Sequence, residues 1–241
     1  MTELIEGGAR DLLLLCDHAS NAVPADIDLG IAPELLDLHI AIDIGAAPLT
    51  RSLAARLDAP AILATVSRLV LDLHREPDHP NLIPKTSDGH EITGNAEIDR
   101  EERLARFHIP YHRAIEDRIR TQQPALILSI HSFTPCLEQG GTPRPWEVGI
   151  LYNEDERAAR PAIAWLRGQG LITGDNEPYS GKLLNATLNR HAEANKIPSI
   201  AIEIRNDLIR DDDGVQRWAD ILAQLAASLR NHLAPNPSAA A

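Results

Sequence analysis

The stretch Ile127-Leu128-Ser129-Ile130-His131-Ser132-Phe133 decides the fold. It is a short and mostly apolar run between Pro124 and Pro135. Apolar runs of roughly four to eight residues bounded by chain breakers are typical of strands buried in a central sheet. His131 stands near the carboxyl end of this predicted strand, where open α/β sheets place their ligands. A lone histidine in such a place is still more often a satisfied core or loop residue than a functional one.

Two other apolar runs also end in ionisable side chains. The first, Leu12 to Leu15, continues into Cys16-Asp17-His18, and the second, Ser199 to Ile202, continues into Glu203-Ile204-Arg205. Three buried strands that each end in a charged or titratable group favour one shared polar site over three unrelated surface positions.

The pattern along the chain predicts an α/β protein. Strand-like runs at residues 12–16, 61–66, 127–133, 148–152 and 199–202 alternate with helical patterns at 34–57, 98–123, 155–167, 186–196 and 214–233. Leu69 to Leu71 is either a further strand or part of a bent one. Strands alternating with helices indicate a three-layer sandwich around a mainly parallel sheet. We expect a single domain over residues 1–234 and a frayed tail over 235–241.

Composition limits the classes of partner. The chain has 241 residues and a net charge of −12, from 23 basic and 35 acidic residues. An acidic surface does not favour nucleic acid as a partner. With only Cys16 and Cys136 present, neither a disulfide framework nor a thiolate zinc site is expected, so the cytoplasm is the predicted location. The sequence shows no signal peptide and no membrane-spanning run.

The motifs of the sequence leave a metal site as the main chemical hypothesis. The sequence contains neither G-x-S-x-G nor G-x-x-x-x-G-K-[ST], so a nucleophile elbow and a phosphate loop are not indicated. His18 and His131, with carboxylates such as Asp43 and Glu203, offer the nitrogen and oxygen ligands that zinc accepts. Their spacing is a weak signal by itself, and ten histidines in the chain leave a merely histidine-rich surface as the alternative.

A set of motifs in order resembles the N-formylglutamate amidohydrolase family. It comprises Cys16-Asp17-His18-Ala19-Ser20-Asn21, His39-Ile40-Ala41-Ile42-Asp43-Ile44-Gly45-Ala46, Ser67-Arg68-Leu69-Val70-Leu71-Asp72, His74-Arg75, Pro110-Tyr111-His112, Ile130-His131-Ser132-Phe133-Thr134-Pro135, Asp175-Asn176-Glu177-Pro178-Tyr179-Ser180-Gly181, His191 and Ile202-Glu203-Ile204-Arg205-Asn206-Asp207-Leu208-Ile209. The resemblance covers roughly residues 12 to 210. At position 74 family members often have asparagine where this chain has histidine.

The resemblance implies a phosphorylase/hydrolase-like fold related to the zinc carboxypeptidases, with a mixed sheet of about eight strands and one Zn²⁺ at the carboxyl ends of the central strands. Carboxypeptidases place a glutamate three residues after their first histidine, and here that position is Asn21. The implied zinc ligands are therefore His18, His131 and, as a substitute, Asp43.

Glu203 is the implied general base. Arg68, Arg75 and Arg205 are the candidates for binding substrate carboxylates, and Asn21, Ser132 and Tyr179 are further candidates for substrate contact. These roles have structural alternatives. Glu203 could instead form an ion pair with Arg205, and Arg68 and Arg75 could simply neutralise Asp72.

The predicted function is that of a zinc-dependent amidohydrolase that removes an N-acyl group, most simply formyl, from an acidic amino acid such as glutamate. The resemblance further implies a place in histidine degradation. Two alternatives stay open: a zinc hydrolase of the same fold acting on another amide or peptide, and a binding or regulatory protein that kept the fold and lost the metal. The expected partner is a small N-acyl amino acid, with neither nucleic acid nor membrane involved.

Overall fold

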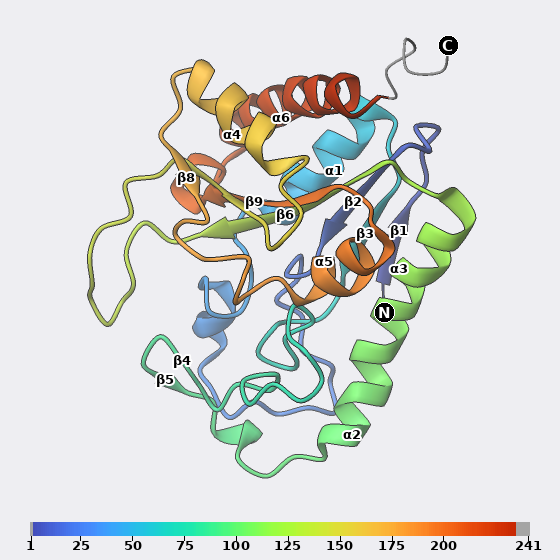
Figure 1. Cartoon of the computed structure of the whole chain (residues 1–241). Helices are drawn as coiled ribbons and strands as arrows, with labels where there is room; N and C mark the ends of the chain where they lie inside the picture. Colours follow the sequence, from blue (N-terminus) through green and yellow to red (C-terminus); the bar gives the residue numbers. More distant parts are fainter. Residues whose placement is uncertain (1, 235–241) are drawn as a thin grey trace, which may run out of the picture.

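The computed structural model describes residues 2–234 and shows three layers, with helices on both faces of a central sheet (Figure 1). Within these residues the main sheet has seven strands in the order β1-β3-β2-β6-β9-β7-β8. Their bounds are β1 Thr2–Ile5, β2 Leu12–Cys16, β3 Ala61–Ala64, β6 Leu126–Phe133, β7 Val148–Leu151, β8 Thr173–Asp175 and β9 Ser199–Arg205.

The centre of the sheet is parallel and its flanks are mixed. Strand β2 pairs in parallel with β3 and β6, and β6 pairs in parallel with β9. The pairs β1–β3 and β7–β9 are antiparallel, whereas β7–β8 is parallel. A short separate hairpin joins β4 Thr86–Ser87 to β5 His90–Glu91. This arrangement confirms the predicted α/β class with a mainly parallel sheet.

Helices cover both faces of the sheet because its central strands are apolar on both sides. Successive side chains of β2 alternate between the two cores: Leu12 and Leu14 pack with one cluster, and Leu13 and Leu15 with the other. Such strands read as continuous apolar runs. The helices are α1 Ala46–Leu57, α2 Arg100–Arg103, α3 Ile109–Gln122, α4 Ala159–Gly168, α5 Ala186–His191 and α6 Asp212–Leu233.

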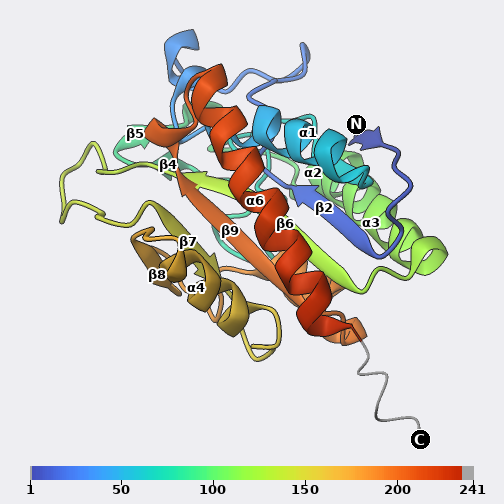
Figure 2. The same ribbon diagram turned by 90° about the horizontal axis from the view of Figure 1, so that it is seen from above.

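Helix α6 lies across β6 and β9 on the face that also carries α1 and α4 (Figure 2). Its Trp218 is fully buried there. Helices α3 and α5 cover the opposite face (Figure 1). Short helical turns complete the chain as η1 Pro33–Asp37, η2 Thr93–Asn95, η3 Leu104–His108, η4 Glu193–Asn195 and η5 Asn206–Leu208. No helix among the described residues combines the length and the hydrophobicity needed to cross a membrane.

The sequence-based assignments differ from the structure at several points. The predicted helical stretch at 34–57 is helical only in η1 and α1. Leu69–Leu71 forms a turn, because the amides of Val70 and Leu71 bond back to the carbonyl of Ser67. Among the described residues the main sheet has seven strands, where the family resemblance implied about eight. Strands β1 and β8 were not predicted. Pro110 stands in the first turn of α3, directly after the π-helical turn η3, where a proline is tolerated. The predicted tail, 235–241, lies outside the described residues.

Candidate active site

The carboxyl ends of three adjacent parallel strands bring the predicted residues together. Asp17 and His18 follow β2, His131 lies in β6, and Glu203 lies in β9, where it is the register partner of His131. The loop before α1 adds Asp43, and the segment after β3 adds Arg68 to Arg75. Side chains far apart in the sequence meet here because parallel strands point their carboxyl ends to one edge of the sheet.

His18, Asp43 and His131 form a triad that could hold a metal ion. One ligand atom from each lies within 4.8 Å of the others, and all three residues are buried. Oδ2 of Asp43 is 3.3 Å from Nδ1 of His18 and 2.9 Å from Nδ1 of His131. Two imidazole nitrogens and one carboxylate oxygen are a ligand set found in catalytic zinc sites.

The opposite nitrogen of each histidine faces a second carboxylate. Nε2 of His18 lies 2.7 Å from Oδ1 of Asp72, and Nε2 of His131 lies 3.5 Å from Oδ2 of Asp17. Acceptors at the Nε2 atoms fix the ring orientations and direct both Nδ1 atoms toward Asp43, where the three side chains could hold a cation. This arrangement fits a metal site better than a set of surface histidines.

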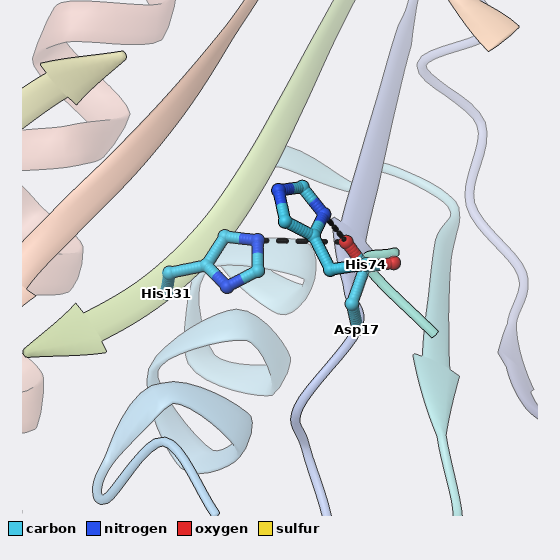
Figure 3. A group of neighbouring side chains, drawn as sticks. All are labelled: Asp17, His74 and His131. Carbon is cyan, nitrogen blue, oxygen red and sulfur yellow. Dashed lines mark hydrogen bonds and ion pairs between the residues drawn. The ribbon is translucent and has the colours of Figure 1, made fainter. Parts of the chain in front are cut away.

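A second group of potential ligands, Asp17, His74 and His131, shares one histidine with the triad (Figure 3). Figure 3 shows both imidazoles directed at the Asp17 carboxylate, with Nδ1 of His74 2.7 Å from Oδ2. The other oxygen of Asp17 accepts the hydroxyl hydrogen of Tyr111 at 2.5 Å. The Asp17 side chain is fully buried and does not line the cavity, so this group lacks the open coordination position that a catalytic metal needs. We therefore assign it to positioning His131.

Charges in the triad stabilise one another without a metal. Burial by itself would disfavour ionised Asp43, but His18, His131 and Arg68 together lower the pKa of its carboxyl group. Burial likewise disfavours protonated His131, but the carboxylates of Asp17 and Asp43 raise its pKa well above the usual value. The site therefore attracts positive charge, which a bound cation would supply in place of protons.

Glu203 is buried, and among residues 2–234 its Oε2 atom has no hydrogen-bond partner. Burial raises the pKa of its carboxyl group to about 7. The alternative in which Glu203 pairs with Arg205 is wrong, because Arg205 binds Asp207 instead, at 2.7 and 3.2 Å. A carboxyl group with a pKa near neutrality beside a potential metal triad has the properties of a general base.

The triad and Glu203 open onto a cavity of about 390 Å³. Four of the six predicted substrate contacts line it: Arg68, Arg75, Ser132 and Tyr179. The other two do not. Arg205 is held by Asp207, and the side chain of Asn21 donates to Asp37 at 3.1 Å. Each of these two side chains therefore bonds to a nearby carboxylate that does not line the cavity.

The two arginines of the cavity are tied to the acidic residues around it. Arg68 bridges Asp43 at 3.2 Å and Asp72 at 3.0 Å, and Arg75 approaches Asp72 at 3.5 Å. Burial disfavours the charged guanidinium of Arg68, but the carboxylates of Asp72 and Asp43 raise its pKa above the usual range. Neutralisation of Asp72 and exposure to the cavity therefore occur together, and one does not exclude the other.

Comparisons with known proteins agree with this geometry. A model of the family described as N-formylglutamate amidohydrolase matches residues 10–210. The chain belongs to this family. Among solved structures, the gene product Atu2144 from Agrobacterium tumefaciens is 31% identical with a TM-score of 0.89, and the match covers 95% of each chain. No curated protein sequence matches the chain significantly.

Two more distant structures share the fold. N-formylglutamate amidohydrolase from Ralstonia eutropha JMP134 is 22% identical with a TM-score of 0.66 over 96% of each chain. A bacteriophage poly-gamma-glutamate hydrolase is 10% identical with a TM-score of 0.51, over 96% of this chain and 89% of that one. Both are consistent with a zinc carboxypeptidase-like fold. Membership of the N-formylglutamate amidohydrolase family makes the chain a hydrolase that acts on a linear amide C–N bond.

Sequence reasoning quoted several of the supporting residues of this family member without giving them a role. Asp17 contacts His74 and His131, and Asp72 contacts His18, so neither carboxylate orients the histidine that stands nearest to it in the sequence. Tyr111 stands out in the sequence only as part of the motif Pro110-Tyr111-His112. Its hydroxyl contact with Asp17 spans 94 positions, so no local pattern could have indicated it.

A histidine cluster of His108, His112 and His191 lies behind the cavity. The rings of His112 and His191 stack, with Nδ1 of His112 2.7 Å from Nε2 of His191. Nε2 of His112 lies 3.1 Å from the carbonyl of Leu73, and Nε2 of His108 lies 3.3 Å from the carbonyl of Arg75. The cluster therefore holds the backbone that carries His74 and Arg75. Burial, reinforced by neighbouring positive charges, lowers the pKa of His191 to about 4 and that of His112 to about 2.

Proposed function

We propose that the chain is a zinc-dependent amidohydrolase that removes an N-acyl group, most simply formyl, from an acidic amino acid such as glutamate. The observation that carries the proposal is the triad of His18, Asp43 and His131 at a cavity wall, with the unpaired carboxyl group of Glu203 beside it. Neither a structural ion pair nor an apolar core explains an unpaired carboxyl group in that position.

The charge balance of the site fits a divalent cation. The triad contains one carboxyl group, and three more carboxyl groups and two guanidinium groups surround it, so the formal charge is −2 when the histidines are neutral and all four carboxyl groups are ionised. The surrounding groups are Asp17, Asp72, Glu203, Arg68 and Arg75. Zinc held by His18, Asp43 and His131 would polarise an amide carbonyl and lower the pKa of water.

Glu203 performs the proton transfers of the proposed reaction. Its carboxylate removes a proton from the attacking water and delivers it to the nitrogen of the leaving amine. The amide C–N bond breaks, the oxygen of the attacking water becomes part of the released carboxylate, and the amino acid leaves with a free amino group. Burial raises the pKa of Glu203, which makes its carboxylate a stronger base.

The arginines of the cavity account for a preference for acidic substrates. Arg75 makes only a 3.5 Å contact with Asp72, so its guanidinium keeps donors available for a substrate carboxylate. The ring and hydroxyl of Tyr179 contact Arg144, which places a second cation next to the cavity wall. Arg205, committed to Asp207, is not part of the proposed substrate contacts.

Metal analysis combined with a substrate panel tests the proposal. Protein purified without chelator should carry close to one equivalent of zinc and should hydrolyse N-formylglutamate faster than N-formyl derivatives of neutral or basic amino acids. Less than a tenth of an equivalent of zinc would favour the metal-free binding protein. A zinc-replete enzyme that prefers peptides or another amide would support the alternative hydrolase of the same fold.

A further inference from the structure

The outer part of the cavity is built by two segments that lie far apart in the sequence. Thr86, Ser87 and Asp88 of the β4–β5 hairpin line one side, and Thr134, Leu137 and Gln139 of the loop 134–147 line the other. Both segments lie on the same side of the molecule in Figures 1 and 2. Their contact therefore decides how far the cavity extends beyond the triad.

Asp88 makes this contact from the tip of the hairpin. Asp88 and Gly89 are the two turn residues, with φ angles of 41° and 87°, as expected for the two-residue turns that join tight hairpins. A residue at such a tip is usually solvated, yet the Asp88 side chain is only 6% exposed. Its carboxylate accepts hydrogen bonds from the backbone amides of Glu138 at 2.8 Å and Gln139 at 3.3 Å.

The same carboxylate also reaches the wall of the cavity beside the triad. Nε2 of His39 lies 3.0 Å from Oδ2 of Asp88, the oxygen that accepts the Glu138 amide. His39 stands four residues before Asp43 in the sequence and lines the cavity. Asp88 thus joins three segments, namely the hairpin, the loop 134–147 and the segment that leads to the triad.

The other attachments of the loop 134–147 lie close to its ends. The guanidinium of Arg144 reaches Tyr179 at 3.0 Å, and residues 145–147 bond to Arg205 and Ile172. In between, Gly140 and Gly141 have open space around them. The stretch around Glu138 and Gln139 is therefore held chiefly by Asp88, with an additional exposed pair between His90 and Glu138 at 2.8 Å.

We propose that Asp88 determines substrate size by tying the loop 134–147 to the β4–β5 hairpin, so that the cavity accepts single N-acyl amino acids with short acyl groups and excludes peptides and long acyl chains. This inference rests on the proposed amidohydrolase function. The cavity of about 390 Å³ is near the lower end of the range for small-molecule sites, which agrees with a small substrate.

The test variant is Asp88→Gly. Glycine adopts the positive φ of this position without strain, so the turn is kept while the carboxylate is removed. His90→Gln is the matched control, because it alters the same hairpin and breaks only the exposed pair with Glu138. Activity is measured on N-formyl, N-acetyl, N-butanoyl and N-hexanoyl glutamate and on N-formylglutamyl dipeptides.

In the wild type, kcat/KM should fall steeply with substrate length. Asp88→Gly should raise the ratio of kcat/KM for long substrates to kcat/KM for short substrates by about tenfold or more. A wall that excludes extra methylenes discriminates between substrates by this factor. His90→Gln should leave the ratio unchanged. Hydrogen exchange of the Glu138 and Gln139 amides should accelerate in Asp88→Gly, which shows that the loop has been released.

Three results would overturn the inference while the proposed function stands. One is a wild type that cleaves dipeptides as fast as N-formylglutamate. The other is an Asp88→Gly variant whose amides exchange faster at 138 and 139 but whose length preference is unchanged. Unchanged exchange would overturn it as well, since the carboxylate would then not hold the loop. A wild type that cleaves no member of the series would overturn the proposed function itself.

Discussion

Replacing Glu203 with glutamine separates the general base from the metal ligands and from structural roles. Glu203→Gln keeps the size of the side chain and removes its negative charge and basic oxygen. If Glu203 is the general base, kcat should fall by about 10²- to 10⁴-fold. Zinc content should not change, because the triad of His18, Asp43 and His131 does not include this residue.

The structure also sets the direction of the stability change. Burial raises the pKa of Glu203 from 4.5 to about 7, so the ionised side chain is disfavoured in the folded protein. Each pKa unit corresponds to about 1.4 kcal/mol, so ionised Glu203 costs on the order of 3 kcal/mol. The contribution of neutral Glu203 to the free energy of unfolding is fully present below pH 4.5 and is lost as pH rises through about 7. At pH 8, metal-free Glu203→Gln should therefore unfold at a higher temperature than the metal-free wild type.

The assay measures turnover, zinc content and melting temperature on the same preparations. Glu154→Gln, which neutralises an exposed carboxylate just beyond β7, is the control and should resemble the wild type in all three. A folded, zinc-replete Glu203→Gln with near-normal turnover would refute the general-base assignment. Loss of zinc would instead place Glu203 among the ligands, and a melting temperature lowered by several degrees would indicate an ion pair that the structure does not contain.

Four further outcomes are expected. His131→Ala and His18→Ala should each lose zinc in metal analysis yet keep a native circular dichroism spectrum, since the large apolar core does not fold around one ion. Asp43→Asn should weaken zinc affinity severalfold in chelator competition, and unchanged affinity with lower stability would make Asp43 structural. Asp17→Asn should weaken zinc affinity by about 10- to 100-fold, as expected for a partner that orients a ligand, and stoichiometric zinc at unchanged affinity would contradict this role. The histidine cluster should make the protein sensitive to acid: its pKa values lie below the unfolded value of about 6.5, so stability is full above that pH and falls as pH decreases toward 4. Urea unfolding at a series of pH values measures it, and a flat profile between pH 7 and 5 would contradict the buried, neutral state of these histidines.

Local patterns in the sequence were sufficient for the central strands and for the main site residues. The runs that become β2, β6 and β9 are apolar on both faces because helices cover both sides of the sheet, and such runs are visible without a structure. His18, His131 and Glu203 could be placed near one another because parallel strands end at one edge. The order of motifs was enough to identify the family, which the match over residues 10–210 confirms.

Tertiary structure decided everything that depends on contacts between distant loops. Strands β1 and β8 were missed because an edge strand of three or four residues carries little periodic signal of its own. Asn21 and Arg205 stand beside His18 and Glu203 in the chain, yet their side chains bind Asp37 and Asp207, because the direction of a side chain depends on the partners that the fold supplies.

The same reason explains the supporting shell of the triad. Asp17 forms hydrogen bonds with Tyr111 and His74, which lie 94 and 57 positions away in the sequence. Asp72 forms one with His18, 54 positions away. Hydrogen bonds act over about 3 Å in space and have no dependence on separation in sequence. The sequence therefore determined which residue types are available for chemistry, and the fold alone determined which of them share a proton, a carboxylate or a cavity wall.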